Sequence, residues 1–337
     1  MTAMPPTTGH LQLVQFANLL ADETIVILCT QPEEPFPFER ASALKQAVRN
    51  HNLKNTTIVH FHKKIPQNPH SPGFRQMWKR MLIEFGVTGR DYIVASEAYG
   101  QWVADIVGAR FYPYDIDRSI NHIKASKIRN NPTLYFDKIL SEFQPYVRTT
   151  VTVFGAESTG KTTLSKQIAK QLHGLWLNEY ARPYLENTIN EISVDSMTSI
   201  WKGQAALQRH ANNVTNSPFV IQDTDLFSTV GYWQFPHWQS TIGACPEKLV
   251  QEATALKSDL YIMTKSNIPF EQDPLRYGGT VREGSDEYWL NVCKDYNLPV
   301  IVLESANQEE RLAEALKAIR TASDSKLSQL TFDRHGY

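Results

Sequence analysis

The chain has 337 residues, of which 42% are hydrophobic and 20% are charged, and its net charge is -1. This length fits two domains of about 150 residues each, and the balanced charge excludes a strongly basic surface for nucleic acid or an anionic membrane. Its three cysteines, Cys29, Cys245 and Cys293, have neither metal-ligand spacing nor a disulfide framework. With no apolar run of about 20 residues and no secretory signal pattern, we expect a cytoplasmic protein without a membrane partner. A homo-oligomer stays open.

The first functional candidate is the turn from Thr7 to His10, which has the sequence T-T-G-H. The residues Leu11, Val14, Ala17 and Leu20 follow it at helical spacing. A helix N-terminus attracts anions, Gly9 allows a close approach, and His10 can donate to phosphate oxygens, so the turn is a candidate triphosphate site. An ordinary Thr N-cap with a nearby histidine is the alternative.

Four strands are expected in the first half, at 23–30, 56–62, 91–95 and 109–114, and helices alternate with them. This alternation predicts a parallel sheet with ligand sites at the carboxyl ends of its strands. After the fourth strand, Ser126, Lys127 and Arg129 stand at an expected helix start and form a second anion-binding candidate. A solvated basic turn is the alternative.

The early T-x-G-H turn, Ser96-Glu97 after a strand, and the segment from Ile123 to Arg129 resemble the nucleotidyltransferase superfamily. In particular, they are similar to nicotinamide-mononucleotide adenylyltransferases. That resemblance implies an Mg²⁺-assisted attack of a mononucleotide phosphate on the α-phosphate of ATP, with pyrophosphate leaving. It also implies site residues. Those for ATP are Thr7, Gly9, His10, Ser126, Lys127 and Arg129, with His10 catalytic, and those for the nicotinamide nucleotide are Trp78, Ser96 and Arg118.

Two features of this half differ from that family's pattern. Lys124 replaces the usual small hydroxyl residue of the late motif, and only Met1 to Pro6 precede the T-x-G-H turn, where the family has a strand. A missing central strand would leave the ladder groups of its neighbours unpaired. We therefore expect either a start codon assigned too late or an impaired first domain.

The second half begins after a Pro-containing connector, and we place the boundary at residue 145. The expected domains are 1–145 and 146–322, with a flexible tail at 323–337. An apolar strand at 149–154 precedes a full G-x-x-x-x-G-K-[ST] phosphate loop, and a helical pattern follows the loop. Such a loop wraps phosphate oxygens with backbone N–H groups, while its Lys neutralises charge and its hydroxyl serves Mg²⁺. The expected ATP-binding residues are Gly155, Glu157, Ser158, Thr159, Gly160, Lys161, Thr162 and Thr163.

Charged residues at later strand ends suit phosphoryl transfer. Glu179 can take a hydroxyl proton and Arg182 can hold the substrate. Asp223 is expected to serve Mg²⁺ with Thr162, and Asp225 to bind the substrate, although the two aspartates are exchangeable at this level. The aromatic stretch with Trp233, Phe235 and Trp238 walls a pyridine pocket or packs the core. Arg276 and Arg282 lie in a glycine-hinged segment that predicts a lid over ATP.

This half resembles the ribosylnicotinamide kinase domain of bifunctional NadR-type proteins. The matching residues are the phosphate loop, Glu179-Tyr180-x-Arg182, Asp223-Thr224-Asp225 and Asp273-x-x-Arg276. The combined resemblance implies an α/β protein with an N-terminal nucleotidyltransferase domain and a C-terminal P-loop kinase domain. Its catalytic residues would be His10, Lys161, Glu179 and Asp223.

The implied function is NAD salvage, with ribosylnicotinamide phosphorylated by ATP to nicotinamide mononucleotide, which a second ATP converts to NAD. Mg²⁺ is the implied cofactor, and no DNA partner is expected, because the chain has no room for the helix-turn-helix segment of some family members. The rivals are a P-loop kinase for another nucleoside with a degenerate first domain, and a module that senses NAD or ATP through that domain. A substrate panel and a test for pyrophosphate release separate them.

Overall fold

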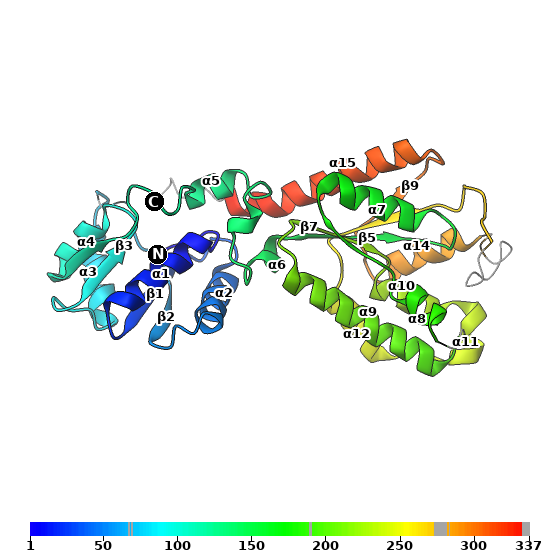
Figure 1. The fold of residues 1–337 in the computed structure, drawn as a ribbon, viewed down its shortest axis with the longest axis horizontal. Coiled ribbons are helices and arrows are strands. Elements are labelled where there is room, and N and C mark those ends of the chain that lie inside the picture. Colours follow the sequence, from blue (N-terminus) through cyan, green and yellow to red (C-terminus); the bar gives the residue numbers. More distant parts are fainter. Residues whose placement is uncertain (67, 69, 189–190, 273–281, 283, 332–337) are drawn as a thin grey trace. The chain divides into compact units, whose positions relative to one another are not determined.

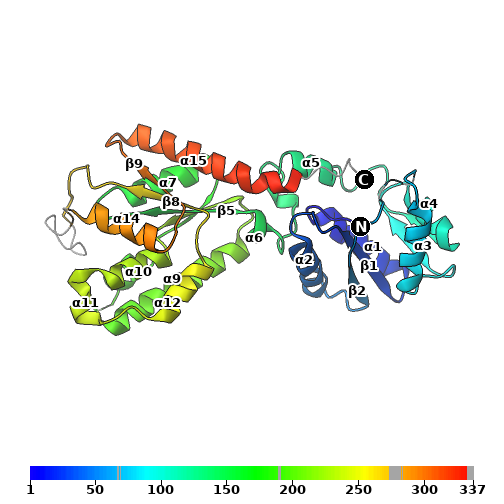
Figure 2. The same ribbon diagram turned by 180° about the vertical axis from the view of Figure 1, so that it is seen from behind.

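The structure is a computed structural model that describes the chain except residues 67, 69, 189–190, 273–281, 283 and 332–337. The chain divides into two compact units. Unit 1 comprises residues 1–146 together with the described residues from 327 to 331, and unit 2 comprises residues 147–326. Figures 1 and 2 show both units as ribbons, each with helices around strands. The expected α/β class with two parallel-sheet domains is confirmed.

Unit 1 alternates helices and strands along the chain. Its elements are α1 (Thr8–Leu20), β1 (Thr24–Thr30), α2 (Pro37–Asn50), β2 (Thr56–His62), α3 (Phe74–Glu84), β3 (Tyr92–Ala95), α4 (Gly100–Val107), β4 (Arg110–Pro113), α5 (Ala125–Asn130), η1 (Phe136–Lys138) and α6 (Gln144–Val147). The four strands match the segments predicted from their apolar runs to within one residue at either end.

The strands of unit 1 form two separate parallel pairs, β1–β2 and β3–β4, rather than one continuous sheet. Helix α1 contacts both β1 and β3. On the edge of β1 away from β2, Met1 alone makes ladder-like bonds among the described residues. Its ammonium donates to the Ile27 carbonyl at 2.7 Å, and its carbonyl accepts from the Cys29 N–H at 2.8 Å. The short segment before Thr7 therefore supplies one paired residue, and the predicted continuous sheet of this half is not formed.

The core of unit 1 lies between its strands and helices α3 and α4. Trp78 and Met81 of α3 pack there with Val103 and Ile106 of α4 against Cys29 of β1. This arrangement follows from the apolar spacing of α3 and α4, which places their large side chains on one face of each helix.

Unit 2 is built around a five-stranded parallel sheet of order β6-β7-β5-β8-β9. Its elements are β5 (Thr149–Phe154), α7 (Lys161–Leu172), β6 (Leu175–Leu177), α8 (Ala181–Glu186), α9 (Val194–Val214), β7 (Phe219–Asp223), α10 (Leu226–Gln234), α11 (Pro236–Ile242), α12 (Glu247–Ala255), β8 (Leu260–Thr264), α14 (Ser285–Asp295), β9 (Val300–Leu303) and α15 (Gln308–Ser328). The short η2 (Gln329–Thr331) follows α15.

Both faces of this sheet are covered, which is why its central strands are apolar throughout. One layer contains α7 and α15, whose Ile168 and Ile319 pack against Val151 of β5. The other contains α9, α10, α12 and α14, with Trp201 and Trp289 near Tyr261 of β8. Because β5 lies at the centre between β7 and β8, the loop after β5 opens beside the ends of both neighbours (Figure 1).

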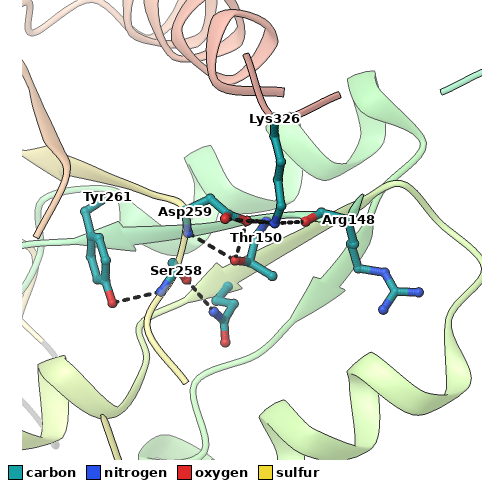
Figure 3. A network of polar contacts seen from close by, with 7 residues as sticks. Arg148, Thr150, Ser258, Asp259, Tyr261 and Lys326 are labelled. Carbon is teal, nitrogen blue, oxygen red and sulfur yellow. Dashed lines mark hydrogen bonds and ion pairs between the residues drawn. The ribbon is translucent and has the colours of Figure 1, made fainter. Parts of the chain in front are cut away.

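Helix α15 extends to Ser328, nine residues beyond the predicted end at 319. Within unit 2, the Lys326 ammonium contacts both carboxylate oxygens of Asp259, at 2.8 and 2.9 Å, and the Arg148 carbonyl. Asp259 also accepts from the N–H and hydroxyl of Thr150, as Figure 3 shows. The flexible tail expected from residue 323 is therefore wrong for 323–331. Polar composition suggested a tail, whereas a specific ion pair and the burial of Leu327 order this segment.

Within the part of the chain that the structure describes, no helix combines the length and apolarity that crossing a membrane requires.

Candidate nucleotide sites

The phosphate loop of unit 2 lies where the sequence placed it, between β5 and α7. Gly155 has φ +129°, and a Cβ there would lie 2.7 Å from the Thr264 carbonyl oxygen, so glycine is required. The buried Thr159 hydroxyl donates to the Ala156 carbonyl at 2.9 Å and lies 2.7 Å from the Thr264 hydroxyl. Gly160, at φ +84°, then starts α7. The loop is thus fixed by bonds to itself and to β8.

A buried arginine that sequence analysis missed supports the loop from below. Arg311 of α15 donates to the Thr159 carbonyl at 2.9 Å, and also to the Lys265 carbonyl and the Asn267 side chain. Burial lowers the pKa of this guanidinium, yet three oxygen acceptors hold it. Nothing in the local pattern of α15 marked it, since an arginine in a helix normally lies on a solvated face.

The candidate magnesium site joins α7 to β7. The β5–β7 register sets Val153 opposite Asp223, and the Thr162 hydroxyl donates to Asp223 Oδ2 at 2.5 Å. Asp223 Oδ1 is buried and has no hydrogen-bond partner among the described residues. Burial raises the pKa of Asp223, while the Thr162 bond and Lys161 oppose that rise. A hydroxyl and an under-coordinated carboxylate are oxygen ligands of the type that Mg²⁺ prefers, so these residues fit the ion.

Charges converge on Glu179, which follows β6. Burial raises the pKa of Glu179 to about 7; Lys161 and Arg182 oppose the shift, and Asp223 adds to it. The Lys161 ammonium donates to the Ala156 carbonyl of its own loop at 2.6 Å. A carboxylate that titrates near neutrality beside a phosphate loop has the properties of a general base.

A cavity of about 250 Å³ contains most of the residues predicted for unit 2. Those from the sequence prediction are Glu157, Ser158, Thr159, Gly160, Lys161, Thr162, Thr163, Glu179 and Arg182. The wall also includes residues that sequence analysis did not assign to the site, among them Gln204, Ser228, Thr229, Tyr232 and Ile268. Of the three candidate aromatics, Trp238 lines the cavity, whereas Trp233 is buried in the core.

Asp225 is occupied elsewhere. Its Oδ1 caps α10 by accepting from the N–H groups of Phe227 and Ser228, and its Oδ2 accepts from the Tyr261 hydroxyl at 2.6 Å. Burial raises the pKa of Asp225 to about 6. The residue does not appear among the described residues that line the cavity. These contacts favour a structural task over the substrate contact that the sequence suggested.

The predicted lid falls only partly within the structure. Arg276 lies outside the described residues. Arg282 is buried, and its Nη2 donates to the Ile268 carbonyl at 2.6 Å, so it holds the start of this segment. Ile268 and Glu271 themselves line the cavity.

In unit 1, Thr7 and His10 form a reciprocal N-terminal cap of α1. His10 Nδ1 lies 2.7 Å from the Thr7 hydroxyl and accepts from the Thr7 N–H at 3.1 Å. The alternative interpretation of the turn, a helix cap, is therefore also correct. Burial lowers the pKa of His10 to about 4, with the N-terminal ammonium, Arg118 and Arg129 adding to the shift. Because Nδ1 is an acceptor, the neutral ring carries its proton on Nε2, which is a donor.

The other predicted residues of unit 1 have varied surroundings. Arg129 donates to the Met4 carbonyl at 2.8 Å, and Arg118 donates to the Ser96 carbonyl at 3.4 Å and pairs with Glu97. Ser126 and Lys127 are exposed on α5. A Cβ at Gly9 would lie 3.4 Å from Asn121 Oδ1, so the loop before α5 already lies close to the T-x-G-H turn.

Trp78 is not where the predicted nicotinamide pocket requires it. Its indole is 8% exposed within the core of unit 1, and its N–H donates to the Pro66 carbonyl at 2.8 Å. Burial of the large apolar ring between α3 and α4 outweighs exposure to a ligand.

The fold and the site together define a two-unit α/β protein with a P-loop nucleotide-binding unit. A family model described as an AAA domain matches residues 150–311, which include the phosphate loop. The chain is also 23% identical to the trifunctional NAD biosynthesis/regulator proteins NadR of Salmonella typhimurium (strain LT2) and Escherichia coli (strain K12). Each alignment covers 94% of this chain and 80% of the relative.

Two solved structures extend the match to the fold. A NadR protein in complex with NR has a TM-score of 0.65 at 20% identity, and a NadR protein in complex with NAD and AMP-PNP has 0.63 at 21%. Both cover 96% of this chain and 94% of the other. The chain is therefore similar to NadR along nearly its whole length, and its architecture is of the NadR type. The resemblance that the sequence motifs indicated is confirmed.

Proposed function

We propose that this chain is an enzyme of NAD biosynthesis that uses two ATP molecules in sequence. Unit 2 would transfer the γ-phosphoryl group of ATP to the 5′-hydroxyl of ribosylnicotinamide. Unit 1 would then join the resulting mononucleotide to the AMP part of a second ATP, releasing pyrophosphate. The likeness to NadR proteins named for NAD biosynthesis supports the pathway, and the cavity beside the phosphate loop supports the first reaction.

In the kinase reaction, the loop N–H groups and Lys161 hold the phosphates and neutralise their charge. Thr162 and Asp223 would hold Mg²⁺, which supplies further charge neutralisation when bound. Glu179 accepts the proton of the attacking hydroxyl, whose oxygen bonds to the γ-phosphorus as the bond to ADP breaks. Arg182, which lines the same cavity, holds the acceptor.

In the adenylyl transfer, the phosphate of the mononucleotide attacks the α-phosphorus of ATP and the bond to pyrophosphate breaks. His10 donates its Nε2–H to a phosphate oxygen as charge develops, and it is neutral at working pH because of its lowered pKa. Arg118 and Arg129 are close enough to influence the His10 ring, so they supply positive charge to the same region.

One observation carries the proposal: the phosphate loop, the Thr162–Asp223 pair and the titrating Glu179 lie together at the carboxyl edge of one sheet. A P-loop switch or motor has no need for a second cavity-lining carboxylate near pH 7. The test is to incubate the purified protein with ATP, Mg²⁺ and ribosylnicotinamide and to separate the products by chromatography. Mononucleotide and NAD are expected, and the absence of both would overturn the proposal.

A second candidate function has support in unit 1. Its strands form two separate pairs, Trp78 is in the core, and Arg129 is bonded to the Met4 carbonyl. These features favour a unit that binds NAD or ATP without turnover beside an active kinase. Mononucleotide formation without NAD or pyrophosphate, combined with tight NAD binding, would establish this alternative.

A further inference from the structure

Gln204 of α9 is a polar residue in the cavity of unit 2 that the mechanism above does not use. It is 2% exposed and lies in the cavity wall with Glu179 and Arg182. The opposite part of the wall includes apolar residues of the same helix, Met197 and Ile200. A buried amide in such a mixed wall can orient a ligand through hydrogen bonds.

Only one end of this amide is satisfied. Gln204 Oε1 accepts from the backbone N–H of Tyr180 at 3.1 Å. Because a backbone N–H can only donate, the oxygen must face Tyr180, and this fixes the position of the NH₂ group. Gln204 Nε2 is buried and has no partner among the described residues. A buried donor left unpaired in a ligand cavity marks the place of an acceptor that the ligand brings.

The amide is also held firmly. The Tyr180 ring lies so close to Gly203 that a Cβ there would be 2.0 Å from a ring carbon. The Gly203-Gln204 pair therefore fixes the Tyr180 ring through close contact and its backbone through a hydrogen bond. Tyr180 directly follows Glu179, so the unpaired NH₂ group lies near the turn that carries the candidate base.

We propose that Gln204 determines acceptor specificity in unit 2 by donating from Nε2 to an oxygen of the nucleoside. That oxygen belongs either to a ribose hydroxyl or to the carbonyl of a ring carboxamide, which share the acceptor chemistry. This inference rests on the proposed kinase function and adds a residue that distinguishes one nucleoside from another. Sites that hydrogen-bond a substrate group reject analogues lacking it far more strongly than apolar pockets do.

The test compares Gln204→Met with Gln208→Met in steady-state kinase assays. Gln208 lies one turn further along α9, is also buried, and donates to the Leu256 carbonyl, but it is not among the described residues lining the cavity. Loss of the Gln204 donor should raise KM for ribosylnicotinamide about tenfold and leave KM for ATP unchanged. Gln208→Met should leave both KM values unchanged.

Substrate analogues separate donation from a merely structural role. Ribosylnicotinamide is compared with its 2′-deoxy, 3′-deoxy and carboxamide-free analogues on both the wild type and Gln204→Met. The analogue that lacks the accepting oxygen should be insensitive to the substitution, which identifies the oxygen. If all analogues lose the same factor, Gln204 only supports the Tyr180 turn and the inference is wrong.

A folding defect and a failure of the proposed function are both distinguishable. Gln204→Glu keeps an oxygen for the Tyr180 N–H and removes the donor, so at pH 8 it should show the same rise in KM if the Met variant is unstable. A wild type that does not phosphorylate ribosylnicotinamide would refute the proposed substrate. A wild type that does, with unchanged KM in both Gln204 variants, would refute only the role of Gln204.

Discussion

The Thr162 hydroxyl donates to Asp223 Oδ2 at 2.5 Å, which joins the first turn of α7 to the end of β7. Two features of the sequence bring these residues together. The phosphate loop places Thr162 next to Lys161 at the start of α7, and the β5–β7 register brings Asp223 to the same edge of the sheet. The pair leaves Asp223 Oδ1 buried without a partner among the described residues, and a bound cation would satisfy it.

Asp223→Asn should reduce the kinase rate about 100-fold at saturating Mg²⁺, because the amide removes the charge that would hold the ion. The control is Asp259→Asn, which changes a carboxylate on the opposite edge of the same sheet that pairs with Lys326. It should lower stability but keep the dependence of rate on Mg²⁺. An unchanged Mg²⁺ dependence in Asp223→Asn would contradict the assignment.

The kinase rate should depend on the ionisation of Glu179. Its pKa, raised by burial to about 7, implies that kcat/KM for the acceptor increases as the pH rises through 7 and then levels off. Glu179→Gln should abolish that limb and reduce kcat about 100-fold. The measurement is a pH–rate profile from pH 5.5 to 9, and a profile of the Gln variant with the same limb would refute the role of general base.

Asp225 should be more important for stability than for acceptor binding. Tyr261→Phe leaves its Oδ2 without the hydroxyl donor and should cost about 1–3 kcal/mol in the free energy of unfolding. Tyr296→Phe, which removes a half-buried hydroxyl bonded to Gln234, is the control and should cost less. A tenfold change in KM for the acceptor without loss of stability would instead support the substrate role.

The stability of unit 2 should also depend on pH through Asp225. Burial raises the pKa of its native carboxyl from 3.8 to about 6, so the native state binds this proton more tightly than the unfolded state does. Its contribution is therefore full below about pH 4 and is lost as the pH rises through 6. Asp225→Asn should flatten this part of the curve in chemical unfolding experiments, and an unaltered slope would contradict the raised pKa.

The adenylyl transfer should show no acidic limb from His10 between about pH 5.5 and 8, because burial and neighbouring positive charge hold its pKa near about 4. His10→Gln, which keeps an amide near the position of the ring, provides the reference profile. A limb near pH 6.5 that disappears in His10→Gln would show that the imidazole titrates normally and that the assigned neutral donor is wrong.

The phosphate loop, the flanking strands and the convergence of Lys161, Glu179 and Asp223 could be predicted, because each depends on local sequence and on parallel strands sharing a carboxyl edge. Arg311 and Gln204 could not. Each acts through one contact across more than 20 residues of sequence, with the Thr159 carbonyl and the Tyr180 N–H respectively. A helical pattern shows that such a residue is on a helix but not which backbone group it meets.

Errors arose where a side chain had two plausible environments. Trp78 was predicted in a pocket and lies in the core, because an indole gains as much from apolar burial as from a ligand. Asp225 follows a strand end like Asp223, yet one residue later it caps α10. The polar tail after residue 322 continues as helix through an ion pair that its composition does not reveal.

The most direct test of two sequential ATP sites is a pair of variants, Lys161→Ala and His10→Ala, assayed separately for each half-reaction. Lys161→Ala should abolish formation of mononucleotide from ribosylnicotinamide while still converting supplied mononucleotide to NAD. His10→Ala should do the reverse, accumulating mononucleotide without NAD. If either variant abolishes both half-reactions while remaining folded, or if neither changes its own, the assignment of two separate sites would be contradicted.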